Sequence, residues 1–131
     1  MSPLQEIIER LEKATGPDRW LDADIHRTVT PGMADTITDF SKGWCIGGNH
    51  VTPVKAPAYT ASLDAALSLV PEGWLWGVNT FPANEVFSPG GAQAFVHHPD
   101  WGDDVELGYE HAEAKTPALA LVIAALKARQ S

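Results

Sequence analysis

The stretch YTASLDAALSLVPEGWLWGVNTF, which runs from Tyr59 to Phe81, predicts a short helix that passes directly into a strand. Ser62 is a good N-cap residue, because its hydroxyl can accept a hydrogen bond from a backbone N–H of the first turn. Pro71 and Gly73 end the helix. Between Ser62 and Pro71, apolar side chains recur at i, i+3, i+4 and i+7 on one helical face (Leu63, Ala66, Leu67 and Val70).

The end of this stretch changes from the period of a helix to that of a strand. Trp74, Trp76 and Val78 alternate with Leu75, Gly77 and Asn79, so each set occupies one face. The stretch therefore joins a helix to a sheet, and the rest of the chain adds helices and strands to this junction.

Two helices are predicted before the junction. The first begins at Ser2, ends before Gly16, and carries one apolar stripe (Leu4, Ile7, Ile8 and Leu11). The second runs from about Asp18 to Arg27. From Thr28 to Pro57 no period holds, and only one short strand is predicted, near Trp44 to Ile46. Irregular stretches of this length inside a domain are often functional.

Two further strands are predicted after the junction. Ala92 to His98 forms the first. The second is a half-buried strand in which Val105, Leu107, Tyr109 and His111 alternate with glutamate and glycine. Three sequential strands with short links favour an antiparallel meander.

A final helix is predicted from Thr116, its N-cap, with Pro117 in the first helical position. Its apolar surface is broad (Leu119, Leu121, Val122, Ile123 and Leu126). Such a helix is either deeply buried or shared with a partner subunit, so a homo-oligomer is predicted.

These elements predict the α/β (α+β) class. The expected architecture is a layered helix–sheet–helix sandwich with a mainly antiparallel sheet of three to five strands, and residues 1–131 form a single domain.

Charge and composition restrict the partners of the chain. Its formal net charge is −8 at pH 7, and it therefore lacks the basic surface that binds nucleic acid or an anionic membrane. No apolar run approaches the roughly 20 residues that span a membrane. Cys45 is the single cysteine, which excludes an internal disulfide. With no signal peptide at the N-terminus, these features predict a cytoplasmic protein.

Three stretches together resemble the phage ABA sandwich domain, a family of small phage and prophage proteins. They are ATGPDRWLDADI (Ala14 to Ile25), YTASLDAALSLVPEGW (Tyr59 to Trp74) and KTPALALVIAALKAR (Lys115 to Arg129). The resemblance implies a layered helix–sheet–helix domain of phage or prophage origin with no established enzymatic activity. This chain has Trp20 where the pattern of the family usually carries an acidic residue.

The sequence contains no decisive catalytic motif. It has neither HExxH nor CxxC for a metal, no GxSxG nucleophile elbow and no P-loop. Cys45 lies in the glycine-rich WCIGGNH, where a flexible turn with a semi-buried thiol is the favoured interpretation. We therefore predict a protein that is not an enzyme and that has no cofactor, catalytic residue or metal.

Aromatic and cationic residues provide the candidate binding site. Five tryptophans are more than usual for this length, and aromatic planes can stack a nucleobase. Arg19 and Lys115 stand at helix starts, where backbone N–H groups can help to hold an anion. The predicted ligand-binding residues are Arg19, Trp44, Tyr59, Trp74, Trp76 and Lys115. Core positions for Trp74 and Trp76, and a salt bridge from Arg19 to Asp18 or Asp22, are the structural alternatives.

Two functions are compatible with these features. The first is a non-enzymatic phage accessory protein that binds a small anionic, nucleotide-like ligand and sequesters a nucleotide-derived immune signal of the host. The second is an interaction or structural protein that acts through its apolar terminal helix and an acidic surface.

Overall fold

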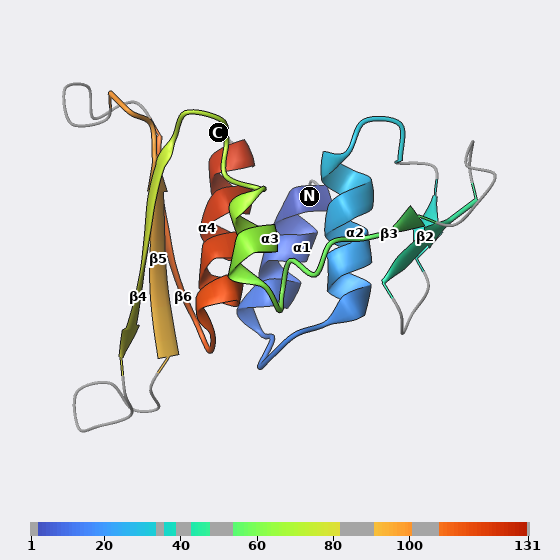
Figure 1. Ribbon diagram of the computed structural model, residues 1–131, viewed down its shortest axis with the longest axis horizontal. Helices are drawn as coiled ribbons and strands as arrows, with labels where there is room; N and C mark the ends of the chain where they lie inside the picture. Colours follow the sequence, from blue (N-terminus) through green and yellow to red (C-terminus); the bar gives the residue numbers. More distant parts are fainter. Residues whose placement is uncertain are drawn as a thin grey trace.

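The computed structural model describes residues 3–33, 36–38, 43–47, 54–81, 91–100 and 108–130. In it, a layer of helices lies between two antiparallel sheets (Figure 1). The helices are α1 (Pro3–Glu12), α2 (Arg19–Val29), α3 (Leu63–Leu67) and α4 (Pro117–Gln130). The smaller sheet contains β1 (Ile37–Thr38), β2 (Trp44–Ile46) and β3 (Val54–Lys55), and the larger contains β4 (Leu75–Phe81), β5 (Gly91–His97) and β6 (Tyr109–Ala114).

Side-chain caps fix where three of the helices begin. Asp18 caps α2, its Oδ1 accepting hydrogen bonds from the N–H groups of Trp20 and Leu21 at 2.9 and 3.1 Å. Ser62 caps α3 and Thr116 caps α4 in the same way. These helix starts are confirmed, whereas Ser2, the predicted cap of α1, lies outside the described residues.

The larger sheet is a meander in the order β4-β5-β6. Trp76 and Val78 of β4 pair with Val96 and Ala94 of β5, which places all four on the face toward the helices. On β5 and β6, four positions of that face are alanines (Ala92, Ala94, Ala112 and Ala114). Small side chains here and along α4 allow the helix to pack closely on β5 and β6.

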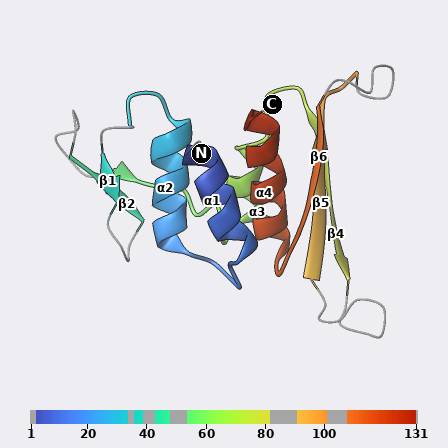
Figure 2. The same cartoon turned by 180° about the vertical axis from the view of Figure 1, so that it is seen from behind.

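Helix α4 lies at the centre of the molecule. Its ten buried residues include Leu119, Leu121, Val122, Ile123 and Leu126, all with no exposed surface. The sheet covers one side of α4, and α1 and α3 cover another (Figures 1 and 2). Of the two interpretations of this broad apolar surface, deep burial within the chain is therefore the observed one, and the predicted homo-oligomer stays a prediction.

The smaller sheet organises part of the stretch that lacks periodicity. β2 confirms the strand predicted near Trp44 to Ile46. β1 and β3 have two residues each, too few to produce a period. A small second core joins this sheet to α2 and is formed by Ala23, Met33, Cys45 and Ala56.

The α+β class, the packing of helices on a sheet and the antiparallel pairing are confirmed, with three strands in each sheet. The order of the layers is sheet–helices–sheet rather than helix–sheet–helix (Figure 2). The large sheet, α1 and α3 cover α4, which is apolar all round, whereas the small sheet packs on α2.

Candidate functional site

Arg19, the first residue of α2, binds groups of its own chain. Its Nη1 donates to Oδ2 of Asp22 at 2.7 Å, and its Nη2 donates to the carbonyl oxygen of Ala56 at 2.7 Å. The guanidinium also lies against Gly43, where an added Cβ would come within 2.5 Å of Arg19 Nε. Arg19 thus fastens α2 to the small sheet, and the salt bridge to Asp22 is the observed arrangement.

Asp22 is the polar centre of this region and is completely buried. Its Oδ1 accepts hydrogen bonds from the backbone N–H and the hydroxyl of Thr60, both at 2.8 Å. Burial raises the pKa of Asp22, and this effect outweighs the opposite effects of Thr60 and Arg19. The hydrogen bonds between Asp22 and Thr60 join the stretch from Ala14 to Ile25 to the stretch from Tyr59 to Trp74.

Tyr59 is buried beside this cluster, so its ring cannot stack on a ligand in this conformation. Its hydroxyl lies 3.0 Å from Nδ1 of His26, and the hydroxyl of Thr30 lies 3.1 Å from the same nitrogen. Burial raises the pKa of Tyr59 and lowers the pKa of His26. A neutral imidazole whose Nδ1 accepts a hydrogen bond fits this arrangement.

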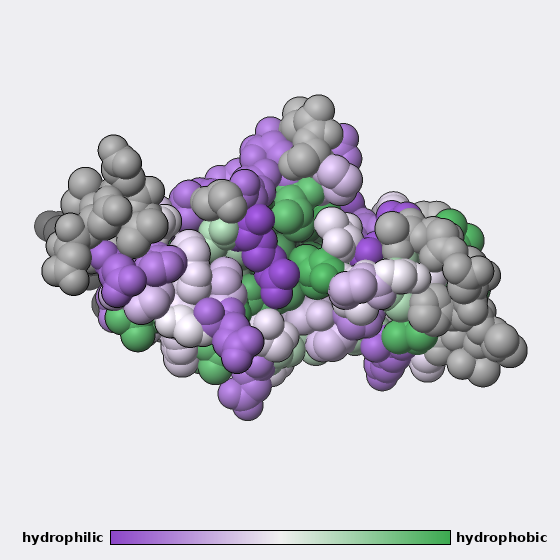
Figure 3. Space-filling model, turned by 90° about the horizontal axis from the view of Figure 1, so that it is seen from above, coloured by the Kyte–Doolittle hydropathy of each residue, from purple (hydrophilic) through white to green (hydrophobic). Residues whose placement is uncertain are grey.

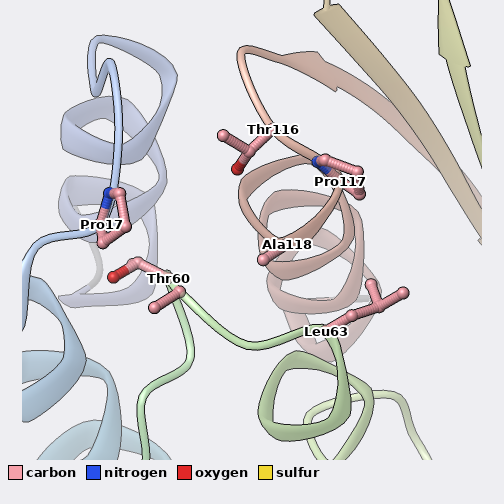
Figure 4. Close-up of a pocket in the computed structure, with 7 residues that line it drawn as sticks. Pro17, Thr60, Leu63, Thr116, Pro117 and Ala118 are labelled. Atoms are coloured by element: carbon pink, nitrogen blue, oxygen red, sulfur yellow. The ribbon is translucent and has the colours of Figure 1, made fainter.

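A shallow pocket of about 220 Å³ lies where α2, α3 and α4 begin (Figure 4). All of its lining residues come from the three resemblance stretches: Pro17, Thr60, Ala61, Leu63, Thr116, Pro117 and Ala118. The lining is mainly apolar, and the volume is below the roughly 300 Å³ at which ligand clefts usually begin. Two predicted ligand-binding residues are adjacent in sequence to this lining: Tyr59, which is buried, precedes Thr60, and Lys115, which is exposed, precedes Thr116.

A smaller, polar pocket of about 110 Å³ lies between α1 and α2. Arg10 donates from Nη1 to Oδ2 of Asp24 at 2.7 Å. Arg27 and Glu6 also line the pocket. Two cations therefore face two carboxylates, and the pocket has no net charge that would attract an anion.

The three tryptophans of the predicted site do not form a single cluster. Trp74 makes a T-shaped contact with His98, with ring centres 5.6 Å apart. Trp76 lies on the helix-facing side of β4, an edge strand, and remains 41% exposed. Trp44 is half-buried in β2, opposite Lys55 in the small sheet. The helix layer separates Trp44 from the other two (Figure 1).

The outer face of the large sheet gathers exposed aromatic side chains. No described helix covers this face (Figures 1 and 2). The strand register arranges nine positions in three rows that cross β4, β5 and β6. The rows are Leu75–His97–Tyr109, Gly77–Phe95–His111 and Asn79–Gln93–Glu113. The face is therefore apolar and aromatic at one end and polar at the other, and we call it the outer face.

The rings of the outer face form a continuous series of ring contacts that extends over the first two rows. Ring centres are 5.8 Å apart between Phe95 and His97, 6.2 Å between His97 and Tyr109, and 6.2 Å between Tyr109 and His111. Phe95 extends over Gly77, where an added Cβ would overlap the Phe95 ring. Leu75 is 51% exposed and Tyr109 40% exposed, so this end of the row faces solvent.

These strands were predicted from the sequence, but their open face was not. In the alternation Val105, Leu107, Tyr109, His111, the last two residues face outward, and the first two lie outside the described residues. The buried side of β6 instead carries Ala112 and Ala114. The alanines of β5 and β6 were the sequence feature that could have identified the buried face, and with it the open one, because small residues mark a sheet face that a helix covers closely.

Hydrophobic side chains occupy only small areas among hydrophilic ones when the molecule is seen from above (Figure 3).

Within the described ranges, no three His, Cys, Asp or Glu side chains are grouped so that they could hold a metal ion. None of the described helices is long and apolar enough to cross a membrane.

Comparisons of the chain with protein families, with curated proteins and with solved structures found no match. The resemblance to the phage ABA sandwich domain therefore stays a prediction.

Proposed function

We propose that this protein is a non-enzymatic binding protein that holds a small ligand with a planar, nucleobase-like ring on its outer face. The observation that carries this proposal is the row of partly exposed rings on the one side of the large sheet that no described helix covers. The proposal keeps the nucleotide-like ligand expected from the sequence and moves its site from Arg19 and the tryptophans to β4, β5 and β6.

The chemistry of the outer face suits a heterocyclic ring. Aromatic side chains on an open sheet are a recurring platform for bases, and stacking contributes about 1–3 kcal/mol per base. The row beyond the rings offers the amides of Asn79 and Gln93, a cross-strand pair. Amide groups can donate and accept hydrogen bonds at the edge of a base. One face thus supplies both a stacking surface and hydrogen-bonding partners.

The charge of the face favours a small ligand over a nucleic acid. None of its nine positions is a lysine or arginine, and the chain carries a net charge of −8. Long-range attraction of a polyanion is therefore weak, and affinity has to come from short-range contacts. Capture without turnover would suit the sequestration of a nucleotide-derived signal, the role that the phage resemblance suggested.

Isothermal titration with adenosine, cyclic AMP and ADP-ribose tests the proposal. We expect binding by the wild type and at least about tenfold weaker binding by Tyr109→Ala, which removes one ring of the row. Leu63→Ala, in the pocket between the helix starts, is the control and should bind as the wild type does. Absence of heat with all three compounds, equal losses in both variants, or recovery of a chemically altered compound would each reject the proposal.

A second copy of the chain is the other occupant that the outer face suits. The exposure of Leu75 favours this candidate, because an aliphatic side chain in a ring-lined surface is typical of a protein contact. Light scattering at high micromolar concentration should then give a dimer mass that Leu75→Glu reduces to that of the monomer. A monomer mass for the wild type would reject self-association through the outer face and leave ligand binding as the proposed function.

A further inference from the structure

The two edge strands of the larger sheet differ in how well they are protected against pairing with another strand. β4, with the sequence LWGVNTF, contains no charged residue and no proline. β6 carries Glu110 and Glu113, and Glu110 lies on the side that faces the helices, opposite Val96. Charges and prolines are the usual means by which an edge strand avoids pairing. We infer that β4 is an interaction surface, at which the larger sheets of two copies of this chain join edge to edge.

The backbone of β4 is available for such pairing on one side. β5 pairs with β4 over its whole length, from Leu75 to Phe81, and no other strand in the described part of the chain pairs with it. In an antiparallel pair, only every second residue directs its N–H and C=O groups to the neighbouring strand. The residues between them direct theirs to the open edge, where they form a template for another extended strand.

Large apolar side chains on both faces of β4 are incompletely covered. Trp76 belongs to the helix-facing side and is still 41% exposed, and Leu75, on the outer face, is 51% exposed. A further strand would lie about 4.8 Å from β4 and would cover the open flank of each side chain. An added strand therefore gains apolar burial on both faces in addition to backbone hydrogen bonds.

The strand that fits this edge is β4 of a second copy. Antiparallel pairing about a twofold axis at Val78, the central residue of β4, places Trp76 opposite Thr80 of the second copy and Gly77 opposite Asn79. No two charges face each other in this register. This matters because each chain has a net charge of −8, and like charges directly opposite each other destabilise strand pairing. Edge pairing also leaves the outer face of both copies open, so it is compatible with a ligand there.

Two variants with the same added charge separate edge pairing from contact through the outer face. Thr80→Glu places a carboxylate at an exposed residue on the helix-facing side of β4, opposite Trp76 of the second copy. Gln93→Glu places one at an exposed residue of the outer face, in the central strand. Light scattering at high micromolar concentration should give a dimer for the wild type and for Gln93→Glu. Self-association of Thr80→Glu should be at least about tenfold weaker, because pairing would desolvate the carboxylate. Thr80→Val, which is uncharged and β-branched, should remain dimeric.

Hydrogen exchange of the wild type locates the interface without any substitution. Exchange of the backbone N–H groups of residues 75–81 should become slower as the protein concentration rises, whereas that of residues 109–114 should not change. A dimer that Thr80→Glu leaves intact, or slower exchange in β6 rather than β4, would overturn the inference. A monomeric wild type would overturn it as well and would leave the edge of β4 to a strand of another protein.

Discussion

Replacing Asp22 by alanine should destabilise the protein more than the loss of any single surface charge. The carboxylate accepts from the N–H and hydroxyl of Thr60 at 2.8 Å and from Arg19 at 2.7 Å. The side chain of Asp22 is fully buried, and that of Arg19 is 26% exposed. Asp22→Ala therefore leaves three donors without their acceptor at the junction of α2 and the segment that leads into α3.

The loss of stability in Asp22→Ala depends on which acceptors remain for each of the three donors. The buried N–H of Thr60 loses its acceptor, which costs about 1–3 kcal/mol. The Thr60 hydroxyl still has the carbonyl oxygen of Asp18 at 3.2 Å, so its loss is small. Arg19 keeps its bond to Ala56 and is partly solvated, which limits its share to about 1 kcal/mol. The total is about 3 kcal/mol, or a melting temperature about 10 °C lower for a chain of this size.

Thermal and urea unfolding followed by circular dichroism measure this loss. Asp22→Asn should lose about half as much, because its amide oxygen can still accept from Thr60. Asp24→Ala on the same helix is the matched control. Its partner Arg10 is 45% exposed, so the cost should be below about 1 kcal/mol. A smaller loss for Asp22→Ala than for Asp24→Ala would refute the reasoning.

Three further predictions concern the core, a buried histidine and the outer face. Leu126→Ala in α4 should cost about 2–5 kcal/mol in urea unfolding, whereas Leu75→Ala, half exposed, should cost almost nothing; equal losses would contradict the burial of α4. Burial lowers the pKa of His26, so its contribution to stability is complete above the usual pKa of about 6.5 and is lost as the pH falls through the lowered folded-state value. The melting temperature of the wild type should therefore fall more between about pH 7.5 and pH 5 than that of His26→Gln, and parallel curves would exclude this role. Gly77→Ala should displace the ring of Phe95 and weaken adenosine binding with little change in melting temperature, and unchanged affinity would count against Phe95 as part of the binding surface.

Helix and strand positions could be predicted well from the sequence, because caps and periodicity are local. Ser62 and Thr116 begin helices where their side chains suggested, and the second helix begins next to Asp18, where its start was predicted. The layer order could not be predicted, since it depends on the large sheet packing on α4 and the small sheet packing on α2. The smaller sheet was mostly missed because it is held by pairings such as Ile37 with Ile46 and Cys45 with Val54, which leave no periodic trace.

The candidate site was harder to predict than the fold. Arg19 appeared in the sequence as a cation at a helix start, but its partner Ala56 is 37 residues away, and sequence spacing does not reveal such a contact. Tyr59 appeared as an aromatic residue near a helix start and proved to be buried. The outer face requires the register of all three strands, because Leu75, Phe95 and Tyr109 become neighbours only through cross-strand pairing.

The small second core gives this protein a chemical reporter of local unfolding. Cys45, the single cysteine, is fully buried between β2 and α2, and its thiol donates to the carbonyl oxygen of Ala23 at 3.4 Å. Burial also raises the pKa of this thiol, so it reacts with an alkylating reagent only after the sheet moves off α2. The alkylation rate of Cys45 therefore measures how often the small sheet opens, and a rate faster than global unfolding allows would define the sheet as an independent cooperative unit.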